Sequence, residues 1–116
     1  GLPAGDCQGQ SLKPVLTGAG MRNRPFVISE YYSKQKWVNP IRMIRTREFK
    51  YNLHVRHGEE LYDLRNDPDE LRNLASDAGY SKRKAELRAE LARWMKTNND
   101  PFFTFQSTGL NGKPLT

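Results

Sequence analysis

Alternation of apolar and polar side chains over residues 48–55 is the feature that most restricts the fold of this chain. One side carries Phe49, Tyr51, Leu53 and Val55, and the other carries Lys50, Asn52 and His54. Successive side chains of a β-strand point to opposite faces of its sheet, so this period of two predicts a strand. The sheet that contains it is expected to be covered on its apolar face.

Three further segments are expected to form strands beside it. Residues 26–32, 41–46 and 60–64 are rich in β-branched, aromatic and other apolar side chains, which favour strands. A polar loop is expected over residues 33–40, because this stretch ends in an asparagine and a proline. The connections between the last three strands are short, which predicts antiparallel neighbours.

A short helix is predicted after the last strand. Asp67 can serve as its N-cap, Pro68 takes the first helical position, and Glu70 stands where a capping-box acid belongs. This helix is expected to end near Ala75.

A longer helix is predicted over residues 81–96. Apolar side chains recur there with the spacing of one helical face. This stripe consists of Leu87, Leu91, Trp94 and Met95. Trp94 is expected to be buried between this helix and the strand over residues 48–55. The predicted fold is therefore α+β, a two-layer sandwich of a four-stranded antiparallel sheet and one long C-terminal helix.

Irregular segments flank this predicted core. Residues 1–24 are rich in glycine and proline, with one helical turn expected from Ser11, and lead into a compact domain over residues 25–101. Residues 102–116 are expected to form an irregular tail. This tail contains Phe102, Phe103 and Phe105. An exposed apolar surface is expected at both ends of the chain, and with it self-association, most simply as a dimer.

Composition and charge exclude several classes of site. Cys7 is the single cysteine among 116 residues, which excludes an internal disulfide and a cysteine-rich zinc site. No apolar run reaches the length of about 18 residues that spans a membrane, and no signal peptide is visible. The net charge of +6 is compatible with an anionic partner. The cations of the long helix, Lys82, Arg83, Lys84 and Arg88, are more typical of a solvated face than of a nucleic-acid site, so we expect no nucleic acid and no membrane as partner.

Residues 41–101 resemble the C-terminal subdomain of the sulfatase family. Residues 44–51, Ile-Arg-Thr-Arg-Glu-Phe-Lys-Tyr, are similar to a strand pair of that family. Residues 60–75 resemble its run of Glu-Leu-Tyr-Asp-Leu, Asp-Pro and Asn-Leu-Ala. Residues 9–18 are similar to the segment that leads into the subdomain. The resemblance covers the chain except for roughly residues 102–116.

This resemblance implies a part of an enzyme that hydrolyses sulfate esters or N-sulfates. In the family, a large preceding α/β domain carries the reaction. Its formylglycine nucleophile is made within a Cys/Ser-x-Pro/Ala-x-Arg motif, and a calcium ion binds the sulfate. Cys7 is followed by Gln-Gly-Gln-Ser, so we expect neither a catalytic residue nor a cofactor in this chain. The missing catalytic domain is the expected partner, and an exported parent protein is implied.

A set of basic and aromatic residues is the candidate substrate-binding site. These residues are Lys34, Lys36, Trp37, Arg42 and His57. An indole can stack on a pyranose ring, and cations can pair with sulfate or carboxylate groups. The resemblance favours a sulfated saccharide, since this subdomain often lines one wall of the family's substrate cleft. The alternatives are a solvated loop with Trp37 packed on the sheet, and a free-standing binding module for a sulfated or other anionic glycan.

Overall fold

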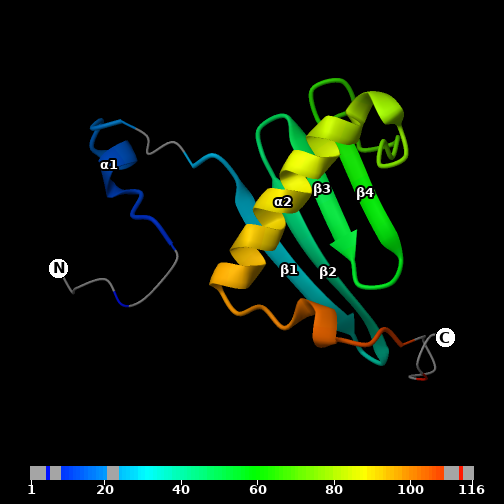
Figure 1. The fold of residues 1–116 in the computed structure, drawn as a ribbon. Coiled ribbons are helices and arrows are strands. Elements are labelled where there is room, and N and C mark those ends of the chain that lie inside the picture. Colours follow the sequence, from blue (N-terminus) through cyan, green and yellow to red (C-terminus); the bar gives the residue numbers. More distant parts are fainter. Residues whose placement is uncertain (1–4, 6–8, 21–23, 109–112, 114–116) are drawn as a thin grey trace.

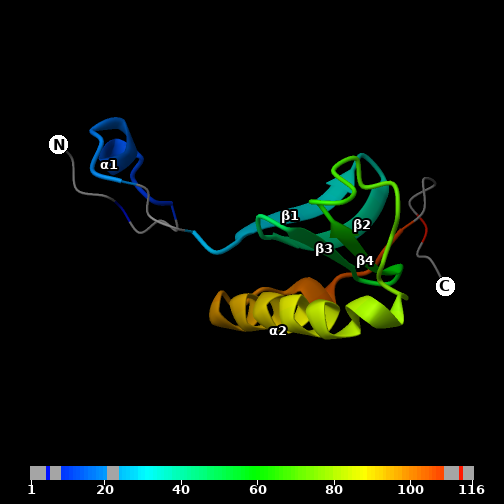
Figure 2. The ribbon, with the colours of Figure 1, turned by 90° about the horizontal axis from the view of Figure 1, so that it is seen from above.

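The computed structural model describes residues 5, 9–20, 24–108 and 113. A four-stranded antiparallel sheet with the strand order β1-β2-β3-β4 forms its main body, and helix α2 covers one face of that sheet (Figures 1 and 2). The strands are β1 (Val27–Lys34), β2 (Trp37–Arg45), β3 (Phe49–His54) and β4 (Gly58–Asp63). The helices are α1 (Lys13–Leu16) and α2 (Ser81–Thr97), with 3-10 turns over Ala78–Tyr80 and Phe102–Thr104. The predicted two-layer α+β fold is confirmed.

Strands β1 and β2 form a tight hairpin where the sequence predicted a loop over residues 33–40. Two residues separate the strands, and the first of them, Gln35, has a φ of 57°. The pairing register places Asn39 and Pro40 opposite Tyr32 alone, which makes a β-bulge. At a bulge, one residue of the strand does not donate to the hydrogen-bond ladder. Proline has no N–H to donate, so β2 can continue through Pro40.

Most of the predicted apolar stripe of α2 faces the sheet. Leu87, Leu91 and Met95 are buried. They pack in one cluster with Ile44, Tyr51, Leu53, Leu61, Leu74, Ala75 and Phe102. The apolar sides of β2, β3 and β4 therefore supply one layer of the core and α2 supplies the other.

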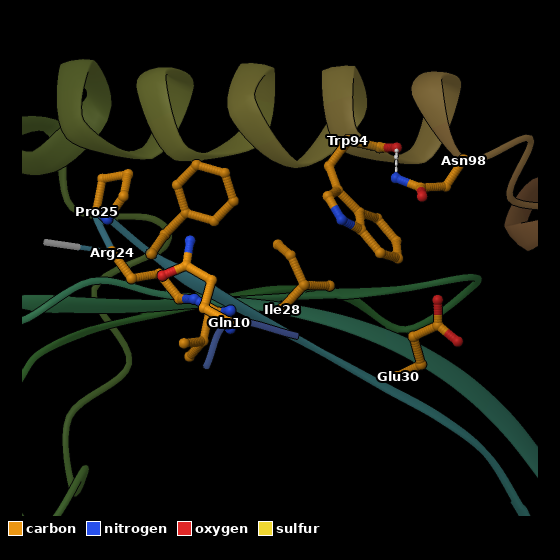
Figure 3. Close-up of a pocket in the computed structure, with 9 residues that line it drawn as sticks. Gln10, Arg24, Pro25, Ile28, Glu30, Trp94 and Asn98 are labelled. Atoms are coloured by element: carbon orange, nitrogen blue, oxygen red, sulfur yellow. Dashed lines mark hydrogen bonds between the residues drawn. The ribbon is translucent and has the colours of Figure 1, made fainter. Parts of the chain in front are cut away.

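Trp94 departs from the prediction for this stripe. Its side chain is half-buried, and it lines a hollow of about 790 Å³ together with Ile28 of β1 (Figure 3). Helix α2 crosses the strands at a steep angle, so its C-terminal end lies over the β1 side of the sheet (Figure 1). The predicted burial of Trp94 against the strand over residues 48–55 is wrong for this reason.

The segment between β4 and α2 contains no helix over residues 67–75, so that prediction is wrong. The Asp67 carboxylate accepts hydrogen bonds from the backbone N–H groups of Leu71 and Arg72, at 3.0 and 2.9 Å. Glu70 has a φ of 56°, in the left-handed region that an α-helix excludes. The capping residues therefore close a loop instead of opening a helix.

This loop also protects the outer edge of β4. The N–H of Leu74 donates to the carbonyl of Leu61 at 2.8 Å, and the N–H of Leu61 donates to Asn73 Oδ1 at 3.0 Å. Asn73 Nδ2 donates in turn to the carbonyl of Glu59 at 3.2 Å. These bonds satisfy edge groups that would otherwise be open to another strand.

The tail after α2 packs against the sheet more closely than expected. Phe102 is fully buried, whereas Phe103 is 73% exposed. The ring of Phe105 is half-buried and meets the ring of Tyr32 edge-on, with 5.0 Å between centroids. The prediction of an exposed aromatic cluster therefore holds for Phe103 alone, because the 3-10 turn directs its neighbour into the core.

The described part of the N-terminal segment has large apolar side chains in solvent. The predicted helical turn is present as α1, and Ser11 Oγ accepts a hydrogen bond from the N–H of Lys13 at 3.2 Å. Leu12 and Leu16 are 69% and 83% exposed. In both views α1 lies apart from the sheet (Figures 1 and 2). Cys7 lies outside the described residues.

Candidate functional site

Two turns of the sheet bring most of the predicted binding residues to one end of the molecule. The strands run in an up-and-down order, so the β1–β2 turn and the β3–β4 turn lie at the same end (Figure 1). Lys36 lies in the first turn, with Lys34 and Trp37 on either side of it at the ends of β1 and β2. His57 lies in the second turn. All four side chains are exposed. We call these four residues the turn cluster.

An aromatic pair forms part of this end. The rings of Tyr31 and Trp37 lie 6.5 Å apart with 57° between their planes, and each side chain is 37% exposed. Lys34 is directly opposite Trp37 in the β1–β2 register. A cation and two aromatic faces are thus available to one ligand. Tyr31 was absent from the predicted site, because the bulge in β2 that sets its position relative to Trp37 has no clear mark in the sequence.

Thr108 holds the first turn from the C-terminal tail. Its hydroxyl donates to the carbonyl of Lys36 at 2.8 Å and accepts from the N–H of Val38 at 3.0 Å. Its own N–H donates to the carbonyl of Val38 at 2.8 Å. These three bonds lie on either side of Trp37. Nothing in the sequence pattern indicated this contact, since it joins residues about seventy positions apart.

Arg42 is not part of the turn cluster. Its side chain is buried and makes two bonds to the Asp100 carboxylate, Nε to Oδ2 at 2.6 Å and Nη2 to Oδ1 at 2.8 Å. Glu30 Oε1 lies 3.8 Å from the same Nε, and the guanidinium carbon is 5.2 Å from the centroid of the Phe102 ring. Two carboxylates surround this single cation, so the surroundings of Arg42 do not favour an anionic ligand. The interpretation of Arg42 as a substrate ligand is corrected to that of a buried structural residue.

The sheet face opposite α2 carries a connected set of polar side chains. Glu60 accepts a hydrogen bond from Asn52 Nδ2, and its Oε1 lies 3.2 Å from His54 Nε2. Next to them, Lys50 pairs with Glu70 from the loop after β4. His54 thus lies beside a neighbouring carboxylate, and its side chain is half-buried. His57 remains the exposed one.

The basic face of α2 is largely neutralised by carboxylates. Lys84 Nζ and Arg88 Nη1 each lie 3.3 Å from an oxygen of Glu59, and Arg83 Nη1 lies 2.9 Å from Glu86 Oε2. The Tyr51 hydroxyl donates to the Glu59 carboxylate and is the main cause of a Glu59 pKa below its usual range. This arrangement supports the interpretation of a solvated helix face.

Asp63, the last residue of β4, is engaged in hydrogen bonds and is not placed in a metal site. Asp63 accepts from the N–H of Arg65 and from both nitrogens of Asn66, and the Asn66 side chain is the main cause of a lowered Asp63 pKa. Among the described residues, no group of three or more His, Cys, Asp or Glu side chains is placed to hold a metal ion. The calcium ion that the family resemblance implies therefore does not fit this part of the protein.

Comparison with known proteins settles the family. The model of the family described as "N-sulphoglucosamine sulphohydrolase, C-terminal" matches residues 2–97. The chain belongs to the sulfatase family. Its α+β body is thus the C-terminal domain expected from the Tyr-Asp-Leu and Asn-Leu-Ala stretches.

Three proteins to which the chain is similar have names or titles that refer to sulfated sugars. A Δ4,5-hexuronate-2-O-sulfatase of Bacteroides thetaiotaomicron is 41% identical over 97 residues, which are 81% of this chain and 20% of that protein. The solved structure of a 2-O GAG sulfatase aligns with a TM-score of 0.84 at 37% identity, over 94% of this chain and 24% of that one. A second solved structure, of a protein in complex with its substrate D-glucosamine-2-N,6-O-disulfate, aligns with a TM-score of 0.73 at 34% identity, over 87% of this chain and 22% of that one.

The chain spans about a fifth to a quarter of the length of these sulfatases. Most of each relative thus has no counterpart in the sequence described above. Over the residues that the structure describes, no helix is long and apolar enough to cross a membrane.

Proposed function

We propose that this sulfatase C-terminal domain lines the substrate cleft of an enzyme that hydrolyses sulfate groups of a sugar. The observation that carries this proposal is the turn cluster, because its four exposed residues come from two turns that lie at the same end of the sheet. The ammonium groups of the two lysines can pair with sulfate or carboxylate, while the indole of Trp37 can stack on a sugar ring. The sulfated sugars named for the relatives have this chemistry.

The catalytic step itself belongs, in this proposal, to a preceding domain. A formylglycine nucleophile and a calcium ion would lie there, since the residues after Cys7 do not form the nucleophile motif and the described carboxylates form no metal site. The domain described here would supply rigid support and part of the cleft wall. It is accordingly expected to be inactive alone.

The first prediction concerns binding of a sulfated sugar. D-glucosamine-2-N,6-O-disulfate is expected to shift the backbone amide NMR signals of both turns, and Lys34→Gln with Lys36→Gln should weaken its binding about fivefold, because two exposed charge pairs are lost. Lys82→Gln on α2 is the matched control and should leave the affinity unchanged. Turnover of an aryl sulfate by the chain alone, or equal affinity for unsulfated glucosamine, would contradict the proposal.

A free-standing glycan-binding module is the alternative function, and the exposed turn cluster is again the observation that favours it. The two proposals differ in what the rest of the protein does. Adding a separately produced catalytic domain of the same protein should restore hydrolysis of the disulfate only if this domain completes a sulfatase cleft. A nucleic-acid site would instead bind DNA regardless of a Trp37→Ala substitution.

A second prediction follows from the exposed apolar side chains of α1. We propose that the preceding domain covers Leu12 and Leu16 in the whole enzyme, because the family model describes a C-terminal part and the relatives are much longer. Alone at high concentration, the chain is expected to self-associate through them, since charge repulsion is screened beyond about 8 Å at physiological salt.

Sedimentation equilibrium measures this self-association. The double change Leu12→Ser and Leu16→Ser should shift the equilibrium to monomer. Leu71, which is 85% exposed in the loop after β4, provides the matched control, and Leu71→Ser should leave the association unchanged. A strict monomer at millimolar concentration would contradict the prediction.

A further inference from the structure

We infer that Thr108 is a positioning residue for Trp37, and that Tyr31 and Trp37 together form a corner that binds the ring of a sulfated pyranose. The ligand part of this inference rests on the proposed function. The positioning part rests on geometry alone. Neither Thr108 nor Tyr31 belongs to the turn cluster that the sequence indicated.

The tip of the β1–β2 hairpin lacks support from β3. Pairing between β2 and β3 begins at Ile41, so the first residues of β2, from Trp37 onward, extend beyond the end of β3. On that side, the N–H of Val55 donates to the carbonyl of Pro40 at 3.1 Å. Nearer the tip, the described bonds come from Thr108, which reaches the carbonyl of Lys36 and both backbone groups of Val38. Trp37 lies between these two anchored residues, so the orientation of its backbone depends on this contact.

The tail that carries Thr108 is itself firmly attached. Phe102 is fully buried in the core, and the Phe105 ring packs edge-on against Tyr32 of β1. Thr108 follows these two anchors by a few residues and forms the isolated bridge to β2. The attached tail thereby restrains the backbone on both sides of Trp37.

The two aromatic rings are arranged as a corner and not as a stack. An angle of 57° and a centroid distance of 6.5 Å leave part of each ring exposed, at 37% for both side chains. A pyranose presents C–H groups on one face, which pack on an aromatic ring, while Lys34 opposite Trp37 can reach an anionic substituent. The corner should therefore require both the sugar ring and its sulfate.

This requirement separates ligands that share only one of the two features. The disulfated glucosamine should bind more tightly than methyl sulfate, which has no ring, and more tightly than unsulfated glucosamine. A site made only of lysines would bind methyl sulfate and the sulfated sugar equally on a per-charge basis.

The test uses Trp37 as its own reporter. The chain contains two tryptophans, so Trp94→Phe leaves Trp37 as the only source of indole fluorescence. In that background, fluorescence anisotropy without ligand reports the mobility of Trp37, and titration with D-glucosamine-2-N,6-O-disulfate reports affinity. The variants are Thr108→Val, Thr108→Ser and Tyr31→Leu. Thr104→Val is the matched control, since its hydroxyl bonds to the carbonyl of Pro101 in the same tail.

Thr108→Val is expected to lower the fluorescence anisotropy of Trp37, because both hydrogen bonds of the hydroxyl are lost. For the same reason it should weaken binding of the disulfate about fivefold. Thr108→Ser keeps the hydroxyl and should restore both values, whereas Thr104→Val should change neither. Tyr31→Leu should weaken binding of the disulfate by a similar factor and leave binding of methyl sulfate unchanged.

Two outcomes would overturn the inference, and each is separable from failure of the proposed function. Unchanged anisotropy in Thr108→Val, or loss that Thr108→Ser does not rescue, would show that the hydroxyl does not position Trp37. Full affinity in Tyr31→Leu would show that the corner is not used. If the parent chain binds no sulfated sugar, the proposed function and the corner both fail, and the anisotropy measurement still decides the role of Thr108.

Discussion

Asp100→Ala is expected to lower the free energy of unfolding by about 3–5 kcal/mol, because the buried guanidinium of Arg42 loses the carboxylate to which it is hydrogen-bonded. The side chains of Arg42 and Asp100 are 5% and 3% exposed, and two bonds of 2.6 and 2.8 Å join them. Small domains are stable by only about 5–15 kcal/mol, so the loss is a large share of the total. The carboxylate also accepts the N–H of Phe102, at 3.0 Å, and that bond disappears as well.

Urea titration followed by circular dichroism measures this loss. The exposed pair of Arg93 and Glu90 is the control, since these side chains are 68% and 33% exposed and Arg93→Ala should cost less than about 1 kcal/mol. Replacing both partners of the buried pair, Arg42→Met with Asp100→Leu, should recover much of the stability, because no charge is then left buried. A cost for Asp100→Ala no larger than that for Arg93→Ala would contradict the prediction.

The Arg42 site shows which part of a site the sequence can reveal. Side chains two positions apart share one face of a strand, and Arg42 precedes Ile44 of the core by two residues. The pattern therefore indicated its face, but its basic charge suggested an anionic ligand. Its actual partner, Asp100, follows α2 and is 58 residues away. No local pattern encodes such a pairing, because it depends on where the helix ends over the sheet.

Local periodicity predicted the regular elements and failed where tertiary contacts decide. Alternation over residues 48–55 and the stripe Leu87–Leu91–Met95 correspond to β3 and α2, since both patterns arise from burial of one face. The Asp67 capping pattern was ambiguous, because the same carboxylate can bond to amides that close a loop. The edge of β4 stabilises that loop through Asn73, and a helix would give up these bonds.

The sequence predicted which residue types form the candidate site, but it did not predict the contacts that position them. Lysine, tryptophan and histidine near two turns were visible in the sequence, and the strand order explains why these turns lie at one end of the sheet. Tyr31 and Thr108 were missed because a bulge and a distant tail position them. Such contacts depend on closeness in three dimensions, so they produce no regular spacing in the sequence.

Phe102→Ala is expected to lower the free energy of unfolding by about 3–5 kcal/mol, whereas Phe103→Ala should have almost no effect. The two neighbours are chemically identical, yet Phe102 is fully buried and Phe103 is 73% exposed. Removing the buried ring leaves a cavity beside Arg42, whose guanidinium carbon lies 5.2 Å from the ring centroid. Urea titration of both variants measures the difference, and equal stabilities would show that the tail is not part of the core.

The same pair of variants also tests whether the tail and the buried ion pair act as one unit. Because Asp100 accepts the N–H of Phe102 and Arg42 lies over its ring, Asp100→Ala and Phe102→Ala remove contacts that depend on each other. Their combined cost should be smaller than the sum of the two single costs, by about 0.5–3 kcal/mol. Asp100→Ala with Phe103→Ala should be additive. An additive result for the Phe102 combination would mean that the ion pair and the aromatic ring stabilise the domain independently.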